Sequence, residues 1–321
     1  MITKLKQFIN DNSVPNANSP VLTALRDLKL NTNDTQFTQQ GEISKRLKHF
    51  FANDQSKSQF LKQLLIIVGD YLQQEKNFFV KLKMLLLVHI IISSQVARAE
   101  FSKMIINTRL IINIKSKDEL ENVLGQLCQS YYCYIYKLAA QTTLINEEFN
   151  KPQDDLMIYF TLSNQCYIGM NMQQLIEKMN KEYDPNPVMA HLVKFLYFDI
   201  QDIYIFILKD VKYLIEKNPS LICNKQQLLE LYKECQSLQS KMLSFYKFNR
   251  LFPHFNQIMP PHSIQIKASV LNGIIEEKAV VKQFGYKQGS YDIREPLSVK
   301  NSDRKVKEYN RPFSPKSKIN Q

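Results

Sequence analysis

The sequence predicts an all-α protein, built as a superhelical stack (α-solenoid) of about nine to ten antiparallel helices around a shared core. Only 7 of the 321 residues are glycine, which is too few for the tight turns of a hairpin-rich β protein. Apolar residues make up 44% of the chain, and along most of its length they recur at the spacing of one helical face. Abundant Lys, Leu, Ile and Gln agree with a helical class.

The N-terminal part of the chain predicts three short helices. A stretch rich in Pro and Asn, residues 12–18, separates the first helix from the second, and a polar loop, residues 31–40, separates the second from the third. The third helix is basic. The three predicted helices span about residues 2–11, Val21–Leu28 and Ile43–Ala52.

The central part predicts five longer helices. β-branched residues over Thr108–Ile114 leave open whether the third of them stays helical to its end or becomes extended there. The sequence Asp184-Pro-Asn-Pro187 ends the fifth, because proline lacks an N–H group and disfavours helix in the residue before it. The five predicted helices are Phe60–Gln73, Phe78–Ser93, Phe101–Asn113, Glu119–Phe149 and Leu156–Glu182.

From Val188 onward the sequence predicts two long amphipathic helices, which end near Lys217 and Tyr246. A last helix is expected over Ile264–Val281. The remaining residues combine Gly, Ser, Pro and mixed charge with few aliphatic residues, which is typical of disorder. The predicted organisation is therefore a helical domain at residues 1–280 and a disordered basic tail at residues 281–321.

The net charge of the chain is +12. Residues 281–321 contain ten Lys or Arg and four Asp or Glu, so the tail carries +6 and the first 280 residues carry the other +6. A moderate positive charge suits an anionic membrane surface or a nucleic acid about equally. Composition alone does not choose between these partners.

The cysteines and the apolar segments indicate a soluble, cytoplasmic protein. The N-terminus lacks the apolar run of a signal peptide. The most apolar window, Phe78–Ile92, contains Lys81, Lys83 and His89 and is shorter than the roughly 20 residues of a membrane span. The cysteines have no metal-ligand spacing and fall in apolar helical patterns. Buried free thiols are expected at Cys128, Cys133, Cys166, Cys223 and Cys235.

Two parts of the chain carry patterns of a known helical family. Near the C-terminal end, a helix ending in Leu-Ile-Glu-Lys217 precedes a helix ending in Leu-Ser-Phe-Tyr246, followed by Phe-Pro and Pro-Pro. The segment Asn77–Ser93 is similar to a helix of the Trp-Val-Val-x-x-Lys-x-Leu-x-x-Leu-His type, with Lys83 and His89 at the matching places. In these patterns, and in their order and spacing over roughly 280 residues, the chain resembles the ANTH domain, the all-helical, phosphoinositide-binding domain at the N-terminus of the monomeric clathrin adaptors.

The resemblance implies a lipid site on the exposed surface. In the family, a Lys in a loop is followed by a Lys/Arg-x-Lys/Arg-His/Tyr pattern at the start of the next helix, and together they bind phosphatidylinositol 4,5-bisphosphate. Sixteen residues separate the two parts here, more than the family spacing. Either an insertion lengthens the loop, or the headgroup site has moved or decayed. The candidate phosphoinositide-binding residues are Lys29, Lys45, Arg46, Lys48 and His49.

The predicted first helix adds a second candidate membrane contact. Apolar residues lie on one face of it with two lysines beside them, which is the pattern of a helix lying in the membrane interface. Family members also carry an N-terminal amphipathic helix. The alternative is that the apolar stripe packs on the domain. The candidate membrane-contact residues are Ile2, Lys4, Leu5, Lys6 and Phe8.

These observations predict a peripheral membrane adaptor in clathrin-mediated endocytosis or vesicle trafficking, bound to inositol phospholipids at the plasma membrane, coated pits or vesicles. The resemblance also implies SNARE helices and clathrin coat components as partners. The Asp-Pro-Phe and Asn-Pro-Phe adaptor motifs of longer family members do not occur in this sequence. The alternative is a non-catalytic helical scaffold that binds another protein's helix with little or no lipid specificity.

No enzymatic activity, metal site or cofactor is predicted. The five histidines are scattered, and His89 is expected to be a satisfied group of the core. No glycine-rich phosphate loop and no Gly-x-Ser-x-Gly motif occurs in the sequence. Nucleic-acid binding is not expected, because Tyr and Phe recur at the spacing of a helical core and Lys outnumbers Arg.

Overall fold

The computed structural model describes residues 20–28, 30, 40–51, 53–148, 156–182, 187–217, 225–252, 260, 261 and 263. These residues all belong to Met1–Ile275, the first of two units into which the chain divides. All regular structure among them is helical, which confirms the predicted all-α class. The predicted helices at about residues 2–11 and 264–281, the boundary at residue 280 and the tail lie outside the described residues.

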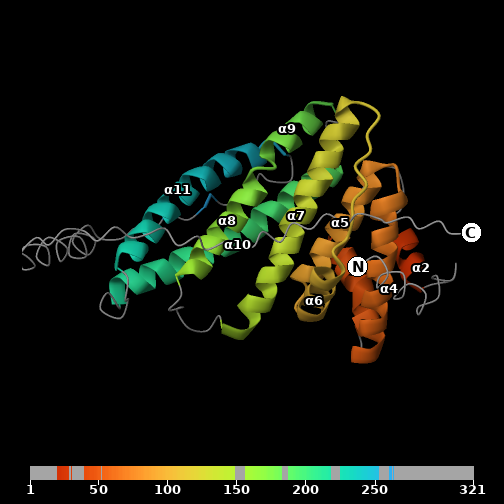
Figure 1. The fold of residues 1–321 in the computed structure, drawn as a ribbon, viewed down its shortest axis with the longest axis horizontal. Helices are drawn as coiled ribbons and strands as arrows, with labels where there is room; N and C mark the ends of the chain where they lie inside the picture. Colours follow the sequence, from red (N-terminus) through yellow and green to blue (C-terminus); the bar gives the residue numbers. More distant parts are fainter. Residues whose placement is uncertain are drawn as a thin grey trace, which may run out of the picture. The chain divides into compact units, whose positions relative to one another are not determined.

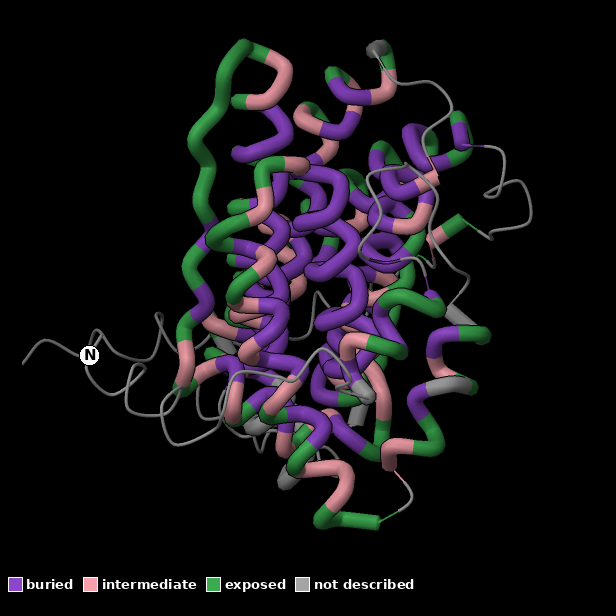
Figure 2. The backbone as a smooth tube through the Cα atoms, turned by 90° about the vertical axis from the view of Figure 1, so that its right-hand side faces the viewer, coloured by how far each residue is buried: buried purple, intermediate pink, exposed green. Residues whose placement is uncertain are grey.

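Ten α-helices and one 3-10 helix, η1, follow one another in the described part of the chain (Figure 1). Helices that are close in sequence pack on each other, and their buried apolar side chains form one cluster through the middle of the stack (Figure 2). The elements are α2 Pro20–Asp27, α3 Gln40–Leu47, η1 Lys48–Phe51, α4 Asp54–Gln74, α5 Phe78–Ser93, α6 Arg98–Thr108, α7 Glu119–Glu148, α8 Met157–Met170, α9 Gln173–Glu182, α10 Pro187–Lys217 and α11 Lys225–Asn249.

Helix α5 is buried along its whole length. Each side chain from Phe78 to Ile92 is buried, because α4, α6, α7 and α10 pack around the helix. Asn77 caps its start by accepting a hydrogen bond from the N–H of Phe79 at 2.8 Å. In the described part of the chain, α5 included, no helix is both long enough and apolar enough to cross a membrane.

A buried hydrogen-bond network joins α5 to α7 and α10 at His89. The Nδ1 atom of His89 lies 2.6 Å from the hydroxyl of Tyr131, and its Nε2 atom is hydrogen-bonded to Oδ2 of Asp199. Burial raises the pKa of Tyr131 well above its ordinary value, so its hydroxyl stays protonated. Because a carboxylate only accepts, Nε2–H of His89 donates to Asp199. The Tyr134 hydroxyl also donates to Asp199 Oδ2, at 3.4 Å. The prediction of His89 as a satisfied core group is confirmed.

Several helices begin or end where the sequence did not indicate. Helix α4 starts at Asp54 instead of Phe60, because the Asn53 side chain accepts the N–H of Ser56 at 2.7 Å and caps the helix. The predicted basic helix Ile43–Ala52 is present as α3, with its last turn tightened into η1. Helix α6 ends at Thr108. The sequence left open whether the residues up to Ile114 are helical or extended, and the structure shows that residues 109–114 are not helical.

The prediction of one continuous helix over Leu156–Glu182 is wrong. Two helices occupy this stretch, α8 and α9, and Asn171 and Met172 lie between them. The N–H of Met172 bonds to the carbonyl of Gly169 at 3.3 Å, the i to i−3 pattern of a tightened turn. Met172 is itself buried, so the apolar periodicity continues across the break and hides it.

Three of the predicted buried thiols, Cys128, Cys166 and Cys235, are buried and free. The prediction for Cys133 is wrong, because this thiol is exposed. It lies on the solvent face of α7 with Gln126 and Gln129, which are also exposed and stand seven and four residues before it. Cys223 lies outside the described residues.

We expect Asp199→Ala to lower the free energy of unfolding by about 1–3 kcal/mol, because it leaves the buried Nε2–H of His89 without an acceptor. Asp202→Ala, which removes an exposed carboxylate from the same helix, is the matched control. Urea denaturation of both variants checks this. An equal loss in the two variants would show that the His89 contact contributes nothing specific.

We expect Gly169→Ala to destabilise the protein by about 1–3 kcal/mol through overpacking. A Cβ at this position would lie 2.6 Å from Cδ1 of Ile200 and 3.0 Å from Cε2 of Tyr134, so α8 would have to move away from α7 and α10. The control is Gly69→Ala on α4, where a Cβ meets only Leu110 at 3.5 Å and the higher helix propensity of alanine should stabilise. Thermal unfolding should move in opposite directions for the two variants.

Candidate functional site

The predicted basic cluster lies on α3 and η1, and packing turns its side chains outward. Ile43 and Leu47 of α3 are buried in the core. The ring of Phe50 in η1 stacks on Phe60 of α4, with centroids 4.2 Å apart. These apolar contacts fix one face of α3 and η1 against α4. The described side chains of the cluster are exposed on the remaining surface, namely Lys45, Lys48 and His49.

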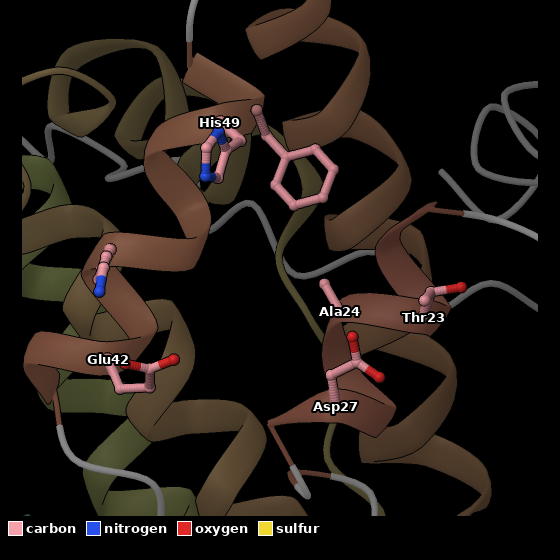
Figure 3. Close-up of a pocket in the computed structure, with 7 residues that line it drawn as sticks. Thr23, Ala24, Asp27, Glu42 and His49 are labelled. Atoms are coloured by element: carbon pink, nitrogen blue, oxygen red, sulfur yellow. The ribbon is translucent and has the colours of Figure 1, made fainter.

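Lys45 and His49 line a hollow of about 490 Å³ between α2 and α3, called here the α2–α3 hollow. They are four residues apart, so they lie on the same side of the helix. Figure 3 shows Glu42 and His49 on the α3–η1 side of the hollow, opposite Ala24 and Asp27 of α2. Two carboxylates thus share the hollow with the two basic side chains, and its walls are of mixed charge.

Lys48 lines a different depression, called here the α3–α5 groove, which has a volume of about 400 Å³. Lys48 is the one charged residue among the described residues that line it. The rim residue Val96 is 59% exposed, so apolar surface is open to solvent beside the lysine. The lining residues are Ser44, Leu47, Lys48, Phe51, Ile90, Ile91, Ser94 and Val96.

The structure therefore brings Lys45 and His49 together and places Lys48 on the adjoining groove. Lys29 and the side chain of Arg46 lie outside the described part of the chain, as do the candidate membrane-contact residues Ile2, Lys4, Leu5, Lys6 and Phe8. The assembly of the full predicted set stays a prediction.

Sequence reasoning missed the acidic side of the α2–α3 hollow and the whole α3–α5 groove. The spacing of Glu42 three residues before Lys45 was a readable signal, because such pairs lie on one helical face. Asp27 comes from another helix, and so do Ile90 and Ile91 of the groove, so their positions depend on tertiary packing.

Two basic residues of α5, Lys81 and Lys83, are buried and add nothing to the charge of the surface. The Nζ atom of Lys81 donates to the backbone carbonyl of Asn113 and lies 5.0 Å from the centre of the Phe78 ring. Burial lowers the pKa of Lys81 below its ordinary value, since the apolar surroundings disfavour the charged amine.

No family model, curated protein or solved structure matches this chain. Among the described residues there is also no cluster of three or more His, Cys, Asp or Glu that could hold a metal ion. The function of this protein must therefore be inferred from the residues and geometry of α3, η1 and their neighbours.

The lowered pKa of Lys81 predicts how stability changes with pH. Between the folded-state pKa and the ordinary value of 10.5 the unfolded chain binds more protons, so the contribution of Lys81 to stability rises with pH through this window. We expect Lys81→Met to remove that rise, and Lys62→Met, at an exposed position of α4, to serve as the control. Urea denaturation from about pH 7 to about pH 10 measures both slopes. Parallel curves for wild type and Lys81→Met would contradict the assignment.

Proposed function

We propose that this protein is a peripheral membrane adaptor of the ANTH type, which binds phosphoinositides through α3 and η1 and acts in endocytic or vesicle traffic. One observation carries the proposal: the exposed basic side chains Lys45, Lys48 and His49 lie within five residues, beside an apolar groove with an open rim. The sequence resemblance to the ANTH domain supports the traffic role and, as possible partners, clathrin coat components.

Electrostatic attraction and apolar contact act together at this surface. A Lys or Arg close to an anionic leaflet contributes about 1 kcal/mol of attraction. Asp27 and Glu42 weaken the attraction on the α2–α3 side, whereas the described residues that line the α3–α5 groove include no acid. We therefore place the headgroup contact on the Lys48 side, where Val96 can enter the membrane interface next to the lysine.

A second candidate function is a helical scaffold that binds another protein's helix, for example a SNARE helix. The α3–α5 groove favours it, because an apolar floor between two helical elements is the surface that accepts the apolar face of an amphipathic helix. The two functions differ in their need for lipid, so vesicle binding separates them.

We expect Lys45→Glu/Lys48→Glu to weaken binding to vesicles containing phosphatidylinositol 4,5-bisphosphate by about thirtyfold or more, since each lost lysine costs about 1 kcal/mol. The control is Lys178→Glu/Lys181→Glu on α9, which makes the same change of charge at two exposed lysines with the same spacing. Co-sedimentation at two salt concentrations measures both, and wild-type binding should fall as salt rises.

Three results would redirect the proposal. Wild-type pelleting of the α3–η1 variant would show that the site is wrong. Equal losses in the two double variants would show general attraction of a cationic protein to an anionic surface. A wild-type protein that binds neither phosphoinositide vesicles nor vesicles of matched charge without phosphoinositide would leave the helix-binding scaffold as the function.

A further inference from the structure

The chain between α6 and α7, called here the 109–117 segment, runs extended beside the helices (Figure 1) and is mostly exposed (Figure 2). Arg109 begins it with φ 48° and ψ 80°, the left-handed conformation that ends α6. Leu110 and Ile112 are each 8% exposed, whereas Ile111 between them is 59% exposed. Over residues 110–113 this alternation is that of a strand with one face on the core and one face in solvent, and beyond it Ile114 is 45% exposed.

Asn113 fixes one edge of the segment to the helices. Its N–H donates to the carbonyl of Leu72 at 3.0 Å, and its own carbonyl accepts from Nζ of Lys81. Its side-chain amide donates to the carbonyl of Gln73 at 3.2 Å. The N–H and C=O groups of a residue in an extended chain point the same way, and those of its neighbours point the opposite way.

The peptide groups of Ile112 and Ile114 therefore point away from the helices. Among the described residues, neither their N–H nor their C=O groups have a hydrogen-bond partner. The segment thus has one edge attached to α4 and α5 and one edge open, as an edge strand of a β-sheet has. An open edge of this kind accepts an added strand through main-chain hydrogen bonds.

The solvent face of the segment is cationic. Arg109, Lys115 and Lys117 are all exposed. Residues 109–117 contain no acid. Two copies of the segment paired antiparallel about Asn113 would set Arg109 opposite Lys117, which is unfavourable. The charge pattern favours an acidic partner over a second copy of this chain.

A lipid surface fits this segment less well than a peptide does. Insertion of Ile111 into a bilayer would carry the unpaired peptide groups of Ile112 out of water, and each unpaired group has a desolvation cost. A peptide that adds to the segment as a strand would instead form hydrogen bonds with these same peptide groups.

We propose that the 109–117 segment is a docking edge for an acidic, extended peptide of another protein, which adds to it as an antiparallel strand. Acidic side chains of the peptide lie opposite Arg109, Lys115 and Lys117, and an apolar side chain lies on Ile111. The peptide exchanges hydrogen bonds with Ile112 and Ile114. This surface is separate from the α3–η1 site and does not rest on the proposed lipid binding.

The probe is a fluorescent nonapeptide, Glu-Thr-Glu-Thr-Thr-Thr-Val-Thr-Glu. In the antiparallel register its acids lie opposite Lys117, Lys115 and Arg109, and its valine lies opposite Ile111. One control peptide carries Lys in place of each Glu. A second is N-methylated at its fourth and sixth residues, which lie opposite Ile114 and Ile112, so that it keeps the charge and loses the main-chain donors.

Fluorescence anisotropy with the full chain should show binding of the acidic probe, and binding of either control peptide at least about tenfold weaker. Amide exchange at Ile112 and Ile114 should slow when the probe binds, because both N–H groups become paired. The amide of Asn113 is already bonded in the free protein and should change little.

Two protein variants complete the test. Ile114→Pro removes one docking N–H group that has no partner within the described part of the protein, and should weaken binding about threefold to tenfold. Ile114→Val keeps the N–H group and should bind like wild type. Circular dichroism melting verifies that both fold.

The proposal is overturned if the probe does not bind, or if the N-methylated peptide binds as well as the probe. It is also overturned if Ile111→Ser lowers vesicle binding while probe binding is unchanged, which would assign the segment to a lipid surface. A dimer that Lys115→Glu/Lys117→Glu disrupts would assign it to a second copy of the chain.

Discussion

Complete burial of α5 is the constraint on which the rest of the structure depends. A helix with every side chain from Phe78 to Ile92 inside the protein must be covered all round, and α4, α6, α7 and α10 supply that cover. Polar groups inside such a core are costly unless they are hydrogen-bonded. Two of the polar side chains of α5 therefore determine which elements sit against it. His89 requires Tyr131 from α7 and Asp199 from α10, and Lys81 requires the carbonyl of Asn113.

The same constraint limits where function can lie. Lys81 and Lys83 cannot reach a ligand at the surface, although they belong to the segment that most resembles an ANTH helix. Surface cations near α5 are instead supplied by η1, whose Lys48 borders the groove over Ile90 and Ile91, and by the segment after α6. Both surfaces follow from the burial of α5. At its C-terminal end, η1 lies beside Ile90 and Ile91, and at its N-terminal end the segment after α6 provides the carbonyl of Asn113 to Lys81.

Local patterns predicted the elements well and the contacts between them poorly. The bounds of α5 followed from its apolar run, and the burial of His89 followed from its apolar neighbours. Its acceptor Asp199 lies 110 residues away in sequence, and no periodicity links the two. The break between α8 and α9 was missed because Met172 continues the apolar stripe, and Cys133 was misassigned because an apolar stretch was treated as if all its faces were buried.

At the candidate site the division of the basic side chains between two surfaces was not predictable from the sequence. Lys45 and Lys48 are three residues apart, a spacing that places them on one helical face. They line different surfaces because α2 borders the hollow and α5 borders the groove. Which of them carries acids was not predictable, because Asp27 reaches the α2–α3 hollow from a separate helix.

The two proposed surfaces use different means to offset the entropy of binding. A bilayer presents many equivalent headgroups, so exposed lysines on α3 and η1 need no fixed geometry to be attracted to it. An added strand requires several main-chain hydrogen bonds at once, and a mobile loop would lose most of their energy in becoming ordered. The 109–117 segment has already been ordered by the burial of Leu110 and Ile112 and by the bonds of Asn113 to Leu72, Gln73 and Lys81. Lys81 lowers the stability of the fold when it is charged, because it is buried. Its hydrogen bond to the carbonyl of Asn113 nevertheless helps to hold the segment in the extended conformation that an added strand requires.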